Sequence, residues 1–383
     1  MRIIPVASGK GGVGKSLVTA NLGVAFAKAG KRVVLVDMDL GASNLHLVLG
    51  QHSPKVGVGT FLNNTKSNFA DIISDTNIKG LRFIPGDNEI PGTANLKVYQ
   101  LKALVKELFA LKNDTDILLI DLGAGTHQSI LDFFLVSGQG IIVAAPTVTS
   151  VLTAYGFLKN AVFRLMFNCC PKNSPANAHL EKLRKDRAAG HEKLYIPKVL
   201  PELKEIDPKS YEKFNTQLQK FSPRLIMNMV SEPKDAEVAM KIRRSCEEYL
   251  AIKIEHLGSI YRDALQDVAL ASRLPVTIYK PQAILSQGIF RIAGKIMQSP
   301  EEAYTLDEKQ IEESFQEAGA EAEADFDSKI EYVEDLLHSG TLSHGDLLET
   351  VKVQQMEISK LKKENNFMKL KLAQALKEGF KVQ

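Results

Sequence analysis

Runs of apolar residues recur along most of the chain, and helical patterns separate them. The runs are continuous rather than alternating, which is typical of strands buried on both faces of a sheet. They fall at residues 2–8, 31–37, 81–85, 116–121, 139–146, 224–230 and 253–260. Between the first two, SLVTANLGVAFAKAG has apolar positions three and four apart and ends at Gly30, as a helix does. The alternation predicts an α/β fold with a doubly wound, mostly parallel sheet.

Changes in composition divide the chain into a main domain and a tail. The main domain is predicted to span residues 1–297. Within it, residues 168–222 are charged and punctuated by proline, and we interpret them as a partly helical insertion. Residues 298–328 are acidic with few core-sized side chains, which favours a flexible linker. Residues 329–383 form a predicted helical tail.

The tail carries apolar or amide residues at spacings that alternate between four and three. This is the a/d seam of a coiled coil, in which an asparagine at an a position fixes register. The seam consists of Leu347, Val351, Gln354, Ile358, Leu361, Asn365, Met368 and Leu372. The end of the tail, NNFMKLKLAQALKEGFK, is also lysine-rich and amphipathic, so a helix lying on a membrane surface competes with the coiled coil. A lone solvated helix is the third interpretation.

Composition narrows the class of protein. With 383 residues, 44% hydrophobic and 24% charged, the chain can bury one large core and still carry an appendage. A net charge of +3 gives no general argument for nucleic-acid or membrane binding. The three cysteines, Cys169, Cys170 and Cys246, fit neither a disulfide framework nor a C-x-x-C site. No apolar run approaches the roughly 20 residues of a membrane span. We therefore expect a cytoplasmic protein, at most peripheral on a membrane.

The stretch SGKGGVGKS, residues 8–16, follows the first predicted strand and precedes the first helix. It satisfies the phosphate-loop pattern G-x-x-x-x-G-K-[ST]. In such a loop, backbone N–H groups cradle phosphates, the lysine neutralises them and the hydroxyl residue binds Mg²⁺. The predicted nucleotide-binding residues are Gly9, Lys10, Gly11, Gly12, Val13, Gly14, Lys15 and Ser16. The pattern needs only the lysine at position 15, so Lys10 requires a separate explanation.

Carboxylates end two predicted strands at one edge of the sheet. Asp121 ends the run 116–121 and precedes LGAG, where it can hold a Mg²⁺ shell while Gly125 offers an N–H to a γ-phosphate. Asp37 and Asp39 end the second strand, where carboxylates can orient a water or a hydrated metal. The predicted metal site combines Ser16, Asp37 and Asp121. The plainer readings are a helix cap for Asp121 and an Asx turn for the pair.

Four segments resemble the deviant P-loop ATPases of the MinD/ParA family in order and spacing, across residues 1–297. They are SGKGGVGKS, VDMDLGASNLHLVLG, LLIDLGAG and AAPTVTSVLTA. The resemblance implies a P-loop fold that binds ATP and Mg²⁺ and hydrolyses ATP slowly as an ATP-bridged homodimer. The second segment is similar to MinD and the flagellar-number regulators (FlhG/FleN), whereas the chromosome-partition branch has D-P-Q-G there.

The resemblance also implies a role for Lys10. It matches the signature lysine, which reaches across the dimer to the partner's nucleotide phosphates. A lysine supplied in trans makes bound ATP a bridge between subunits, and hydrolysis its release. The other reading is a solvated loop lysine.

The remaining roles follow residue by residue from the same resemblance. Lys15 and Ser16 are the phosphate and Mg²⁺ ligands, and Asp121 holds the metal's water. Asp39 positions the attacking water, so Lys10, Asp39 and Asp121 form the predicted catalytic set. Asn228 matches the asparagine that contacts adenine.

Two further polar residues allow two readings each. Asn44 lies in GASN, where its amide suits a γ-phosphate or caps a helix equally well. His127 follows the Asp121 loop and either contacts the phosphate region or the partner subunit, or is a turn histidine without a role.

The predicted function is an ATPase switch that positions or counts a cellular structure, the flagellum or the division site. A protein partner is expected through the tail or the 168–222 insertion. A partition ATPase would need a basic surface patch for DNA, and nucleic acid is not favoured. An iron–sulfur carrier of the same fold would need thiolates that bridge the dimer. A metabolic enzyme that uses ATP to activate a small substrate is the last alternative.

Overall fold

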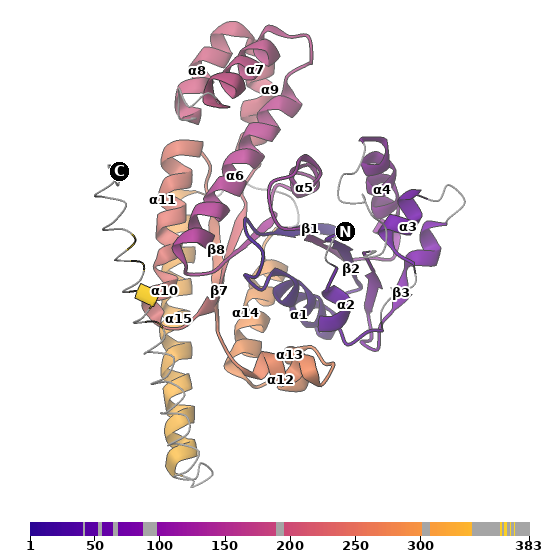
Figure 1. Cartoon of the computed structure of the whole chain (residues 1–383), viewed down its shortest axis with the longest axis vertical. Coiled ribbons are helices and arrows are strands. Elements are labelled where there is room, and N and C mark those ends of the chain that lie inside the picture. Colours follow the sequence, from indigo (N-terminus) through magenta and orange to yellow (C-terminus); the bar gives the residue numbers. More distant parts are fainter. Residues whose placement is uncertain are drawn as a thin grey trace. The chain divides into compact units, whose positions relative to one another are not determined.

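A sheet flanked by helices on both faces forms the centre of the protein in its computed structural model (Figure 1). The structure describes residues 1–40, 43–52, 56–63, 68–86, 98–188, 195–300 and 307–338, with Leu361, Glu364, Asn365, Met368 and Lys371. Within these residues the strand order is β3-β4-β2-β5-β1-β6-β7-β8, and all neighbours are parallel except β3 and β4. The strands are β1 (Arg2–Ala7), β2 (Val33–Met38), β3 (Ser74–Asp75), β4 (Leu81–Ile84), β5 (Ile117–Leu122), β6 (Ile141–Ala144), β7 (Arg224–Val230) and β8 (Glu255–Tyr261).

Helices of two groups cover the two faces of this sheet. One face packs against α1 (Lys15–Lys28), α2 (Leu45–Val48), α12 (Leu265–Ala271), α13 (Val276–Tyr279) and α14 (Ile284–Gln298). The other packs against α3 (Val58–Asn63), α4 (Val98–Ala110), α5 (Gln128–Phe134), α6 (Val148–Cys169), α10 (Pro233–Ala236) and α11 (Val238–Leu250). Short 3-10 turns η1 (Phe69–Ile72) and η2 (Leu111–Asn113) complete the connections.

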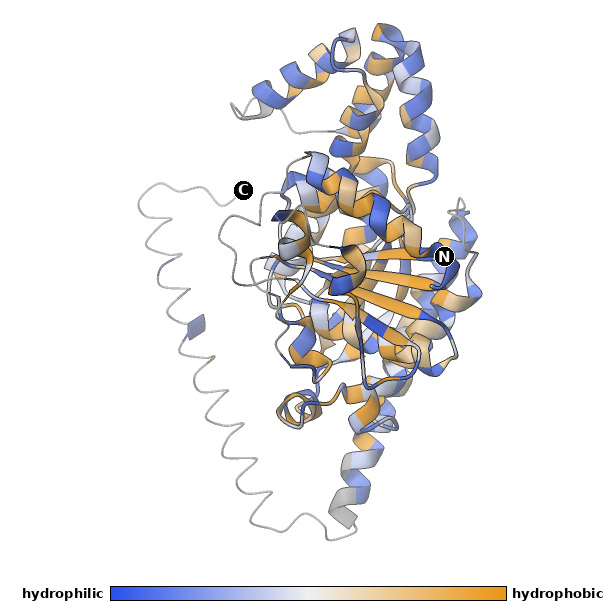
Figure 2. Ribbon diagram, turned by 90° about the vertical axis from the view of Figure 1, so that its right-hand side faces the viewer, coloured by the Kyte–Doolittle hydropathy of each residue, from blue (hydrophilic) through white to orange (hydrophobic). Residues whose placement is uncertain are grey.

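The continuous apolar runs form strands because both faces of the sheet are covered. In β2, Val34 and Val36 enter one core while Val33 and Leu35 enter the other. Figure 2 shows these apolar strands between the helical layers. The predicted doubly wound, mostly parallel fold is confirmed. The strand that the sequence analysis missed, β3, has two exposed residues at the antiparallel edge of the sheet and gives no apolar signal.

The segment 168–222 contains α7 (Pro175–Ala188), α8 (Ile196–Ile206) and α9 (Pro208–Gln219), grouped around the end of α6 (Figure 1). Their buried apolar side chains include Leu180, Leu203 and Phe214. These residues join the core that covers the α6 face of the sheet. The charged residues of the segment therefore surround an apolar interior.

The acidic residues 298–328 were predicted to form a flexible linker, and the structure differs from this prediction. From residue 308 the structure instead has a long helix, α15 (Glu308–His338). Ile311, Phe315, Ala318 and Ala322 are all buried, and their spacing of four, three and four residues is helical. The prediction of a linker relied on the acidic composition and overlooked this stripe of small and apolar residues. The first compact unit of the chain accordingly extends from Met1 to Phe326.

The acidic residues of α15 lie opposite basic side chains of the domain rather than in solvent alone. Glu312 pairs with Arg243 of α11, and Asp325 pairs with Arg291 of α14. Glu321 accepts from the Lys295 ammonium at 3.0 Å. Most of these pairs are partly exposed, so they orient the helix more than they stabilise it. Burial of the apolar stripe is the larger contribution.

The second unit, Asp327–Gln383, contains the end of α15 and the whole of the predicted tail. Of the proposed coiled-coil seam, Leu361, Asn365 and Met368 are helical. Leu361 and Met368 are more than half exposed. The other seam positions, and all of the alternative membrane helix (residues 365–381) except Asn365, Met368 and Lys371, lie outside the described residues. Coiled coil and membrane-surface helix both remain predictions. No helix within the described ranges is both long and apolar enough to span a membrane.

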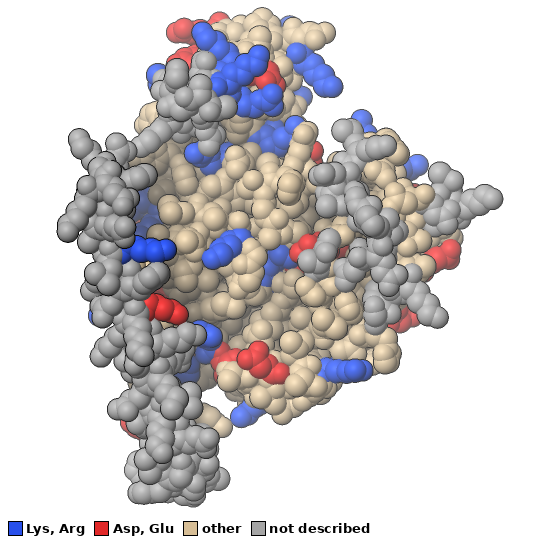
Figure 3. All heavy atoms as spheres, viewed as in Figure 1, with Lys and Arg blue, Asp and Glu red and all other residues tan. Residues whose placement is uncertain are grey.

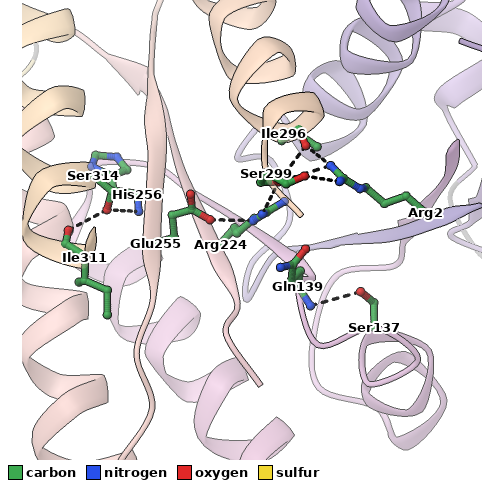
Figure 4. Close-up of polar contacts among 10 residues, drawn as sticks. All are labelled: Arg2, Ser137, Gln139, Arg224, Glu255, His256, Ile296, Ser299, Ile311 and Ser314. Carbon is green, nitrogen blue, oxygen red and sulfur yellow. Dashed lines mark hydrogen bonds and ion pairs between the residues drawn. The ribbon is translucent and has the colours of Figure 1, made fainter. Parts of the chain in front are cut away.

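A polar cluster lies at the amino ends of β1, β7 and β8 (Figure 4). The phosphate loop follows the other end of β1. Arg224 is 1% exposed; it donates to Glu255 at 2.8 Å and to the Ser299 hydroxyl at 2.7 Å. Arg2 donates to the carbonyl oxygens of Ile296 and Ser299. These bonds hold the end of α14 against the sheet. Because Arg224 is paired with Glu255 and Arg2 is bound to main-chain oxygens of the α14 end, we assign the cluster a structural role.

His256 of β8 is expected to make the protein sensitive to acid. Its ring packs on Phe315 of α15, with centroids 5.1 Å apart, and its Nε2 is buried without a partner. Burial and the nearby Lys295 lower the pKa of His256 to about 3. The unfolded chain protonates near pH 6.5, so stability is complete above that pH and falls as the pH drops toward 3. When the pH is lowered from 7.5 to 5, protonation of this residue in the unfolded chain lowers the free energy of unfolding by about 2 kcal/mol.

Urea unfolding of the wild type and of His256→Leu at both pH values measures this contribution. The packing cost of leucine cancels, because each variant is compared with itself at two pH values. We expect the pH-dependent loss to shrink by about 2 kcal/mol in the variant. An equal loss in both proteins would show that His256 does not titrate on unfolding.

Candidate functional site

The carboxyl ends of β1, β2 and β5 meet at one edge of the sheet and bring the predicted residues together. In the parallel register Asp37 of β2 lies opposite Asp121 of β5, and Asp121 also lies opposite Val6 of β1. The loop of residues 8–16 leaves β1 directly beside these carboxylates and leads into α1. Ligands of open α/β sheets bind at this edge.

Backbone geometry explains the glycines of the loop. Gly12 and Gly14 have φ values of 80° and 79°, in the left-handed region that side chains disfavour. Gly14 is also the N-cap of α1. Gly9 is required for a different reason: a Cβ there would lie 2.1 Å from the Thr153 carbonyl oxygen of α6. Val13 is buried, whereas Gly11 and Gly12 are exposed.

Lys15 lies inside this loop and faces Asp121. Its ammonium donates to Asp121 Oδ1 at 2.8 Å, and the Ser16 hydroxyl lies 3.4 Å away. Lys15 is 6% exposed and Asp121 is fully buried, so the pair is shielded from water. The second oxygen of Asp121, Oδ2, is buried without a partner. The loop thus holds a cation, a hydroxyl and an unsatisfied carboxylate oxygen together.

Thr19 is a site residue that the sequence analysis did not identify. Its hydroxyl oxygen lies 2.9 Å from Asp121 Oδ1 and 2.9 Å from the Lys15 carbonyl oxygen, and its single proton is shared between these two acceptors. Thr19 follows Lys15 by four residues on α1, so both face the same way. That spacing was the available signal. Thr19 fixes the orientation of the carboxylate that Lys15 contacts.

Asp37 organises the chain that follows β2. Its Oδ1 accepts from the Asp39 amide at 3.0 Å, and its Oδ2 accepts from the Ser43 hydroxyl at 2.6 Å and the Leu45 amide at 3.2 Å. Burial and the neighbouring Asp121 raise the pKa of Asp37 to about 6. Asn44 occupies the N-cap position of α2 without a side-chain capping bond.

Asp39 lines a small cavity. The cavity measures about 190 Å³ and is lined by Asp39, Gly123 and His127 among others. A Cβ at Gly123 would lie 3.5 Å from Asp39 Oδ1, so the carboxylate lies close against that strand end. His127 is exposed and sits at the N-cap of α5 without a capping bond. Asp39 and His127 therefore face one cavity large enough for water.

Gly125 and Asn228 both contact the phosphate loop in this structure. Gly125, with φ of 100°, donates its N–H to the Ser8 carbonyl oxygen at 3.4 Å. Asn228 is 3% exposed, and its amide nitrogen donates to the Val13 carbonyl oxygen at 2.8 Å. A Cβ at Gly14 would lie 2.2 Å from that nitrogen. Asn228 thus supports the loop from β7, and its adenine contact stays a prediction.

Lys10 differs from Lys15 in its surroundings. It is exposed, and its ammonium donates to the Thr149 hydroxyl of α6 at 3.3 Å. The Ser8 hydroxyl donates to the Lys10 carbonyl oxygen at 3.0 Å and fixes the turn. The two lysines of the loop are therefore separated into a buried one at the carboxylates and an exposed one on the surface.

The chemistry of the donor set fits Mg²⁺ bound with a phosphate. The Ser16 hydroxyl and the unpartnered Oδ2 of Asp121 are hard oxygen atoms at one end of the loop, of the kind that Mg²⁺ prefers. In the described part of the chain, no group of three or more His, Cys, Asp or Glu side chains is arranged to hold a metal by itself. Mg²⁺ usually takes one or two protein ligands and completes its shell with water and phosphate.

Comparison with known proteins identifies relatives of this chain. Residues 4–382 match the family of the CobQ/CobB/MinD/ParA nucleotide binding domain. A putative septum site-determining protein MinD of Emiliania huxleyi is 36% identical over 155 residues, covering 40% of this chain and 55% of that protein. Antiactivator FleN of Pseudomonas aeruginosa is 30% identical over 159 residues, covering 42% and 56%. The chain thus spans little more than half the length of these relatives.

A solved structure supports the fold. The septum site-determining protein MinD from Pyrococcus horikoshii, complexed with Mg-ADP, aligns with 78% of this chain and 96% of its own. The TM-score is 0.51 and the identity 22%. Similarity at this level establishes a common architecture.

Proposed function

Because this chain belongs to the family of CobQ/CobB/MinD/ParA nucleotide-binding domains, as its motifs predicted, we propose that it is an ATPase that dimerises on ATP. Its relatives are named for septum-site determination and for antiactivation. The proposed role is a positional switch: the ATP-bound dimer regulates the place or number of a cellular structure, and hydrolysis releases it. The proposed location is the cytoplasm, with the tail as the segment that meets a partner or a membrane surface.

The observation that carries the proposal is the separation of the two lysines. Lys15 is buried against Asp121, which suits a group that serves the nucleotide of its own subunit. Lys10 is exposed on a surface turn and bound only through one long hydrogen bond among the contacts described. An exposed lysine at the nucleotide edge can reach a phosphate of a second subunit. Electrostatic stabilisation of this kind is worth most in a site that excludes water, as a dimer interface does.

Each residue of the site has a proposed task. Lys15 and the loop amides bind phosphate, and Ser16 with Asp121 would hold Mg²⁺, which neutralises phosphate charge when bound. Asp39, facing its small cavity, orients the attacking water and accepts its proton. Asp37 holds the Asp39 amide and the following turn in place. The two lysines then supply positive charge from two subunits.

The iron–sulfur alternative has little support. Cys169, Cys170 and Cys246 are all buried, and burial raises the pKa of each thiol. Cluster ligands need thiolates at a shared surface. A DNA-partition ATPase remains the second candidate, because Lys182, Arg184 and Lys185 of α7 are exposed cations. Basic residues gather over that region in Figure 3.

Lys10→Ala tests the proposed dimer. Wild-type protein with ATP and Mg²⁺ is expected to elute as a dimer in size-exclusion chromatography with light scattering, and as a monomer with ADP. Loss of a charge contact to phosphate costs about 2–5 kcal/mol, so the variant should stay monomeric at concentrations about 30-fold above the wild-type midpoint. Lys112→Ala, which removes an exposed lysine elsewhere, is the control. A Lys10→Ala protein that dimerises normally contradicts the proposal.

A further inference from the structure

A groove between α6 and α11 lies beside the nucleotide edge and is not used by the proposed chemistry. It measures about 810 Å³. Val148 and Leu152 of α6 form one side, Tyr249 of α11 forms the other, and Tyr195 closes it from the residue before α8. In Figure 3 the middle of this face of the molecule is broad and largely uncharged.

The groove exposes large apolar side chains in one place. Val148 is 77% exposed, Leu152 63%, Tyr195 42% and Tyr249 41%. Single exposed apolar residues are ordinary, but a contiguous group marks an interaction site. The rings of Tyr195 and Tyr249 meet edge to face with centroids 6.1 Å apart. Paired tyrosines form a rigid wall that loses little entropy on binding.

The charges at the groove are positive. Among the described residues that line it, the charged side chains are Lys159 and Lys241. The Lys159 ammonium lies 5.9 Å over the Tyr155 ring, which holds it at the edge of the groove. Glu248, outside the lining, raises the pKa of the neighbouring Tyr249. A complementary ligand would combine an apolar stripe with acidic residues beside it.

We infer that this groove docks an amphipathic helix with acidic flanks from a partner protein. A helix fits better than an extended strand because the walls are helices and offer no open strand edge for pairing. The apolar face of the incoming helix contacts Val148, Leu152 and the two tyrosines, while its carboxylates meet Lys159 and Lys241. Tyr195 comes from the 168–222 segment, so that segment completes the docking surface.

The groove shares a helical turn with Lys10. Thr149, which accepts from the Lys10 ammonium, lies between Val148 and Leu152 on α6. A helix bound to those two side chains therefore contacts the turn that holds the exposed lysine. The connection between the docked helix and Lys10 rests on the proposed dimer. Docking of the helix does not, because its binding can be measured without nucleotide.

The test uses the full chain and fluorescent peptides of about 15 residues. The acidic probe carries leucines at helical spacing of three and four with glutamates elsewhere, and the matched probe has lysine for every glutamate. Fluorescence anisotropy without nucleotide is expected to show the acidic probe binding at least about tenfold more tightly than the basic one. Leu152→Glu, and separately Lys159→Glu with Lys241→Glu, should each weaken the acidic probe at least about tenfold.

Leu270→Glu supplies the matched control, because Leu270 is a 43% exposed leucine on α12, outside the groove. Thermal unfolding by circular dichroism verifies that each variant is folded, and Tyr249→Ala gives a second variant without added charge. Equal binding of the two probes, no binding of the acidic probe, or an equal loss in Leu270→Glu overturns the inference. A nucleotide-free dimer that Leu152→Glu dissolves would assign the groove to a second copy of this chain, and would also overturn it.

Discussion

Replacing Lys15 with alanine is expected to abolish productive ATP binding. The ammonium is buried at 2.8 Å from Asp121, and a nucleotide phosphate would take up the same charge. Truncating one partner of a buried charge pair costs about 2–5 kcal/mol, so the ATP dissociation constant should rise about 30-fold or more. Isothermal titration calorimetry with ATP and Mg²⁺ measures this directly. The rate of ATP hydrolysis should fall together with the ATP affinity.

Folding of this variant requires its own control. Lys15→Ala leaves Asp121 buried without its cation, which destabilises a protein by about 3–5 kcal/mol. The double variant Lys15→Ala with Asp121→Asn also removes the unpaired carboxylate charge. It should recover most of that stability without recovering ATP binding. Lys31→Ala, an exposed lysine after α1, should bind ATP as the wild type does. A folded Lys15→Ala protein with unchanged affinity would remove Lys15 from the site.

Asp39→Ala is expected to separate binding from hydrolysis. The carboxylate faces the small cavity beside Gly123 and His127 rather than the Lys15 pair. Its loss should therefore leave ATP affinity within about threefold of the wild type, while the turnover number falls about 100-fold or more, as loss of a general base does. The ATP dimer should then persist instead of decaying.

Steady-state phosphate release and light scattering over time measure the two effects. Asp71→Ala, which removes an exposed carboxylate of η1, serves as the control and should hydrolyse normally. His127→Ala tests the other polar residue of the cavity in the same assay. Normal hydrolysis by Asp39→Ala would rule out the proposed role of that carboxylate and leave the water-orienting group to another residue of the cavity.

The apolar patterns of this chain determine its sheet. Runs such as residues 116–121 and 224–230 are continuous because both faces of a parallel sheet are covered, and local sequence carries that information. The phosphate loop is equally local, since Gly12 and Gly14 adopt left-handed geometry within one turn. Strand ends at one edge then place Asp37 beside Asp121 through register alone.

Contacts between distant segments of the chain could not be predicted from local sequence. Thr153 of α6 lies against Gly9, and Asn228 of β7 supports Val13, over separations of more than 100 residues. Such contacts depend on how helices pack on the sheet, which no local pattern specifies. For this reason the sequence analysis did not predict that Asn228 supports the phosphate loop.

The acidic stretch after residue 298 shows where composition misleads. Average charge predicted a linker, yet the buried stripe from Ile311 to Ala322 belongs to a helix on the domain. Its carboxylates find partners such as Arg243 and Arg291 only when α11 and α14 are folded. A charge that is paired in the native state looks the same in sequence as one that is solvated.

The sequence by itself determined the fold class, the phosphate loop, the carboxylates at the sheet edge and the family, because each depends on residues close together in the chain or on strand order. Only the tertiary structure decided which of two loop lysines is buried, that α15 packs on the domain, and that Tyr195 and Tyr249 share one groove. Those features depend on burial and on contacts between distant segments, and both exist only once the sheet and its helices have packed.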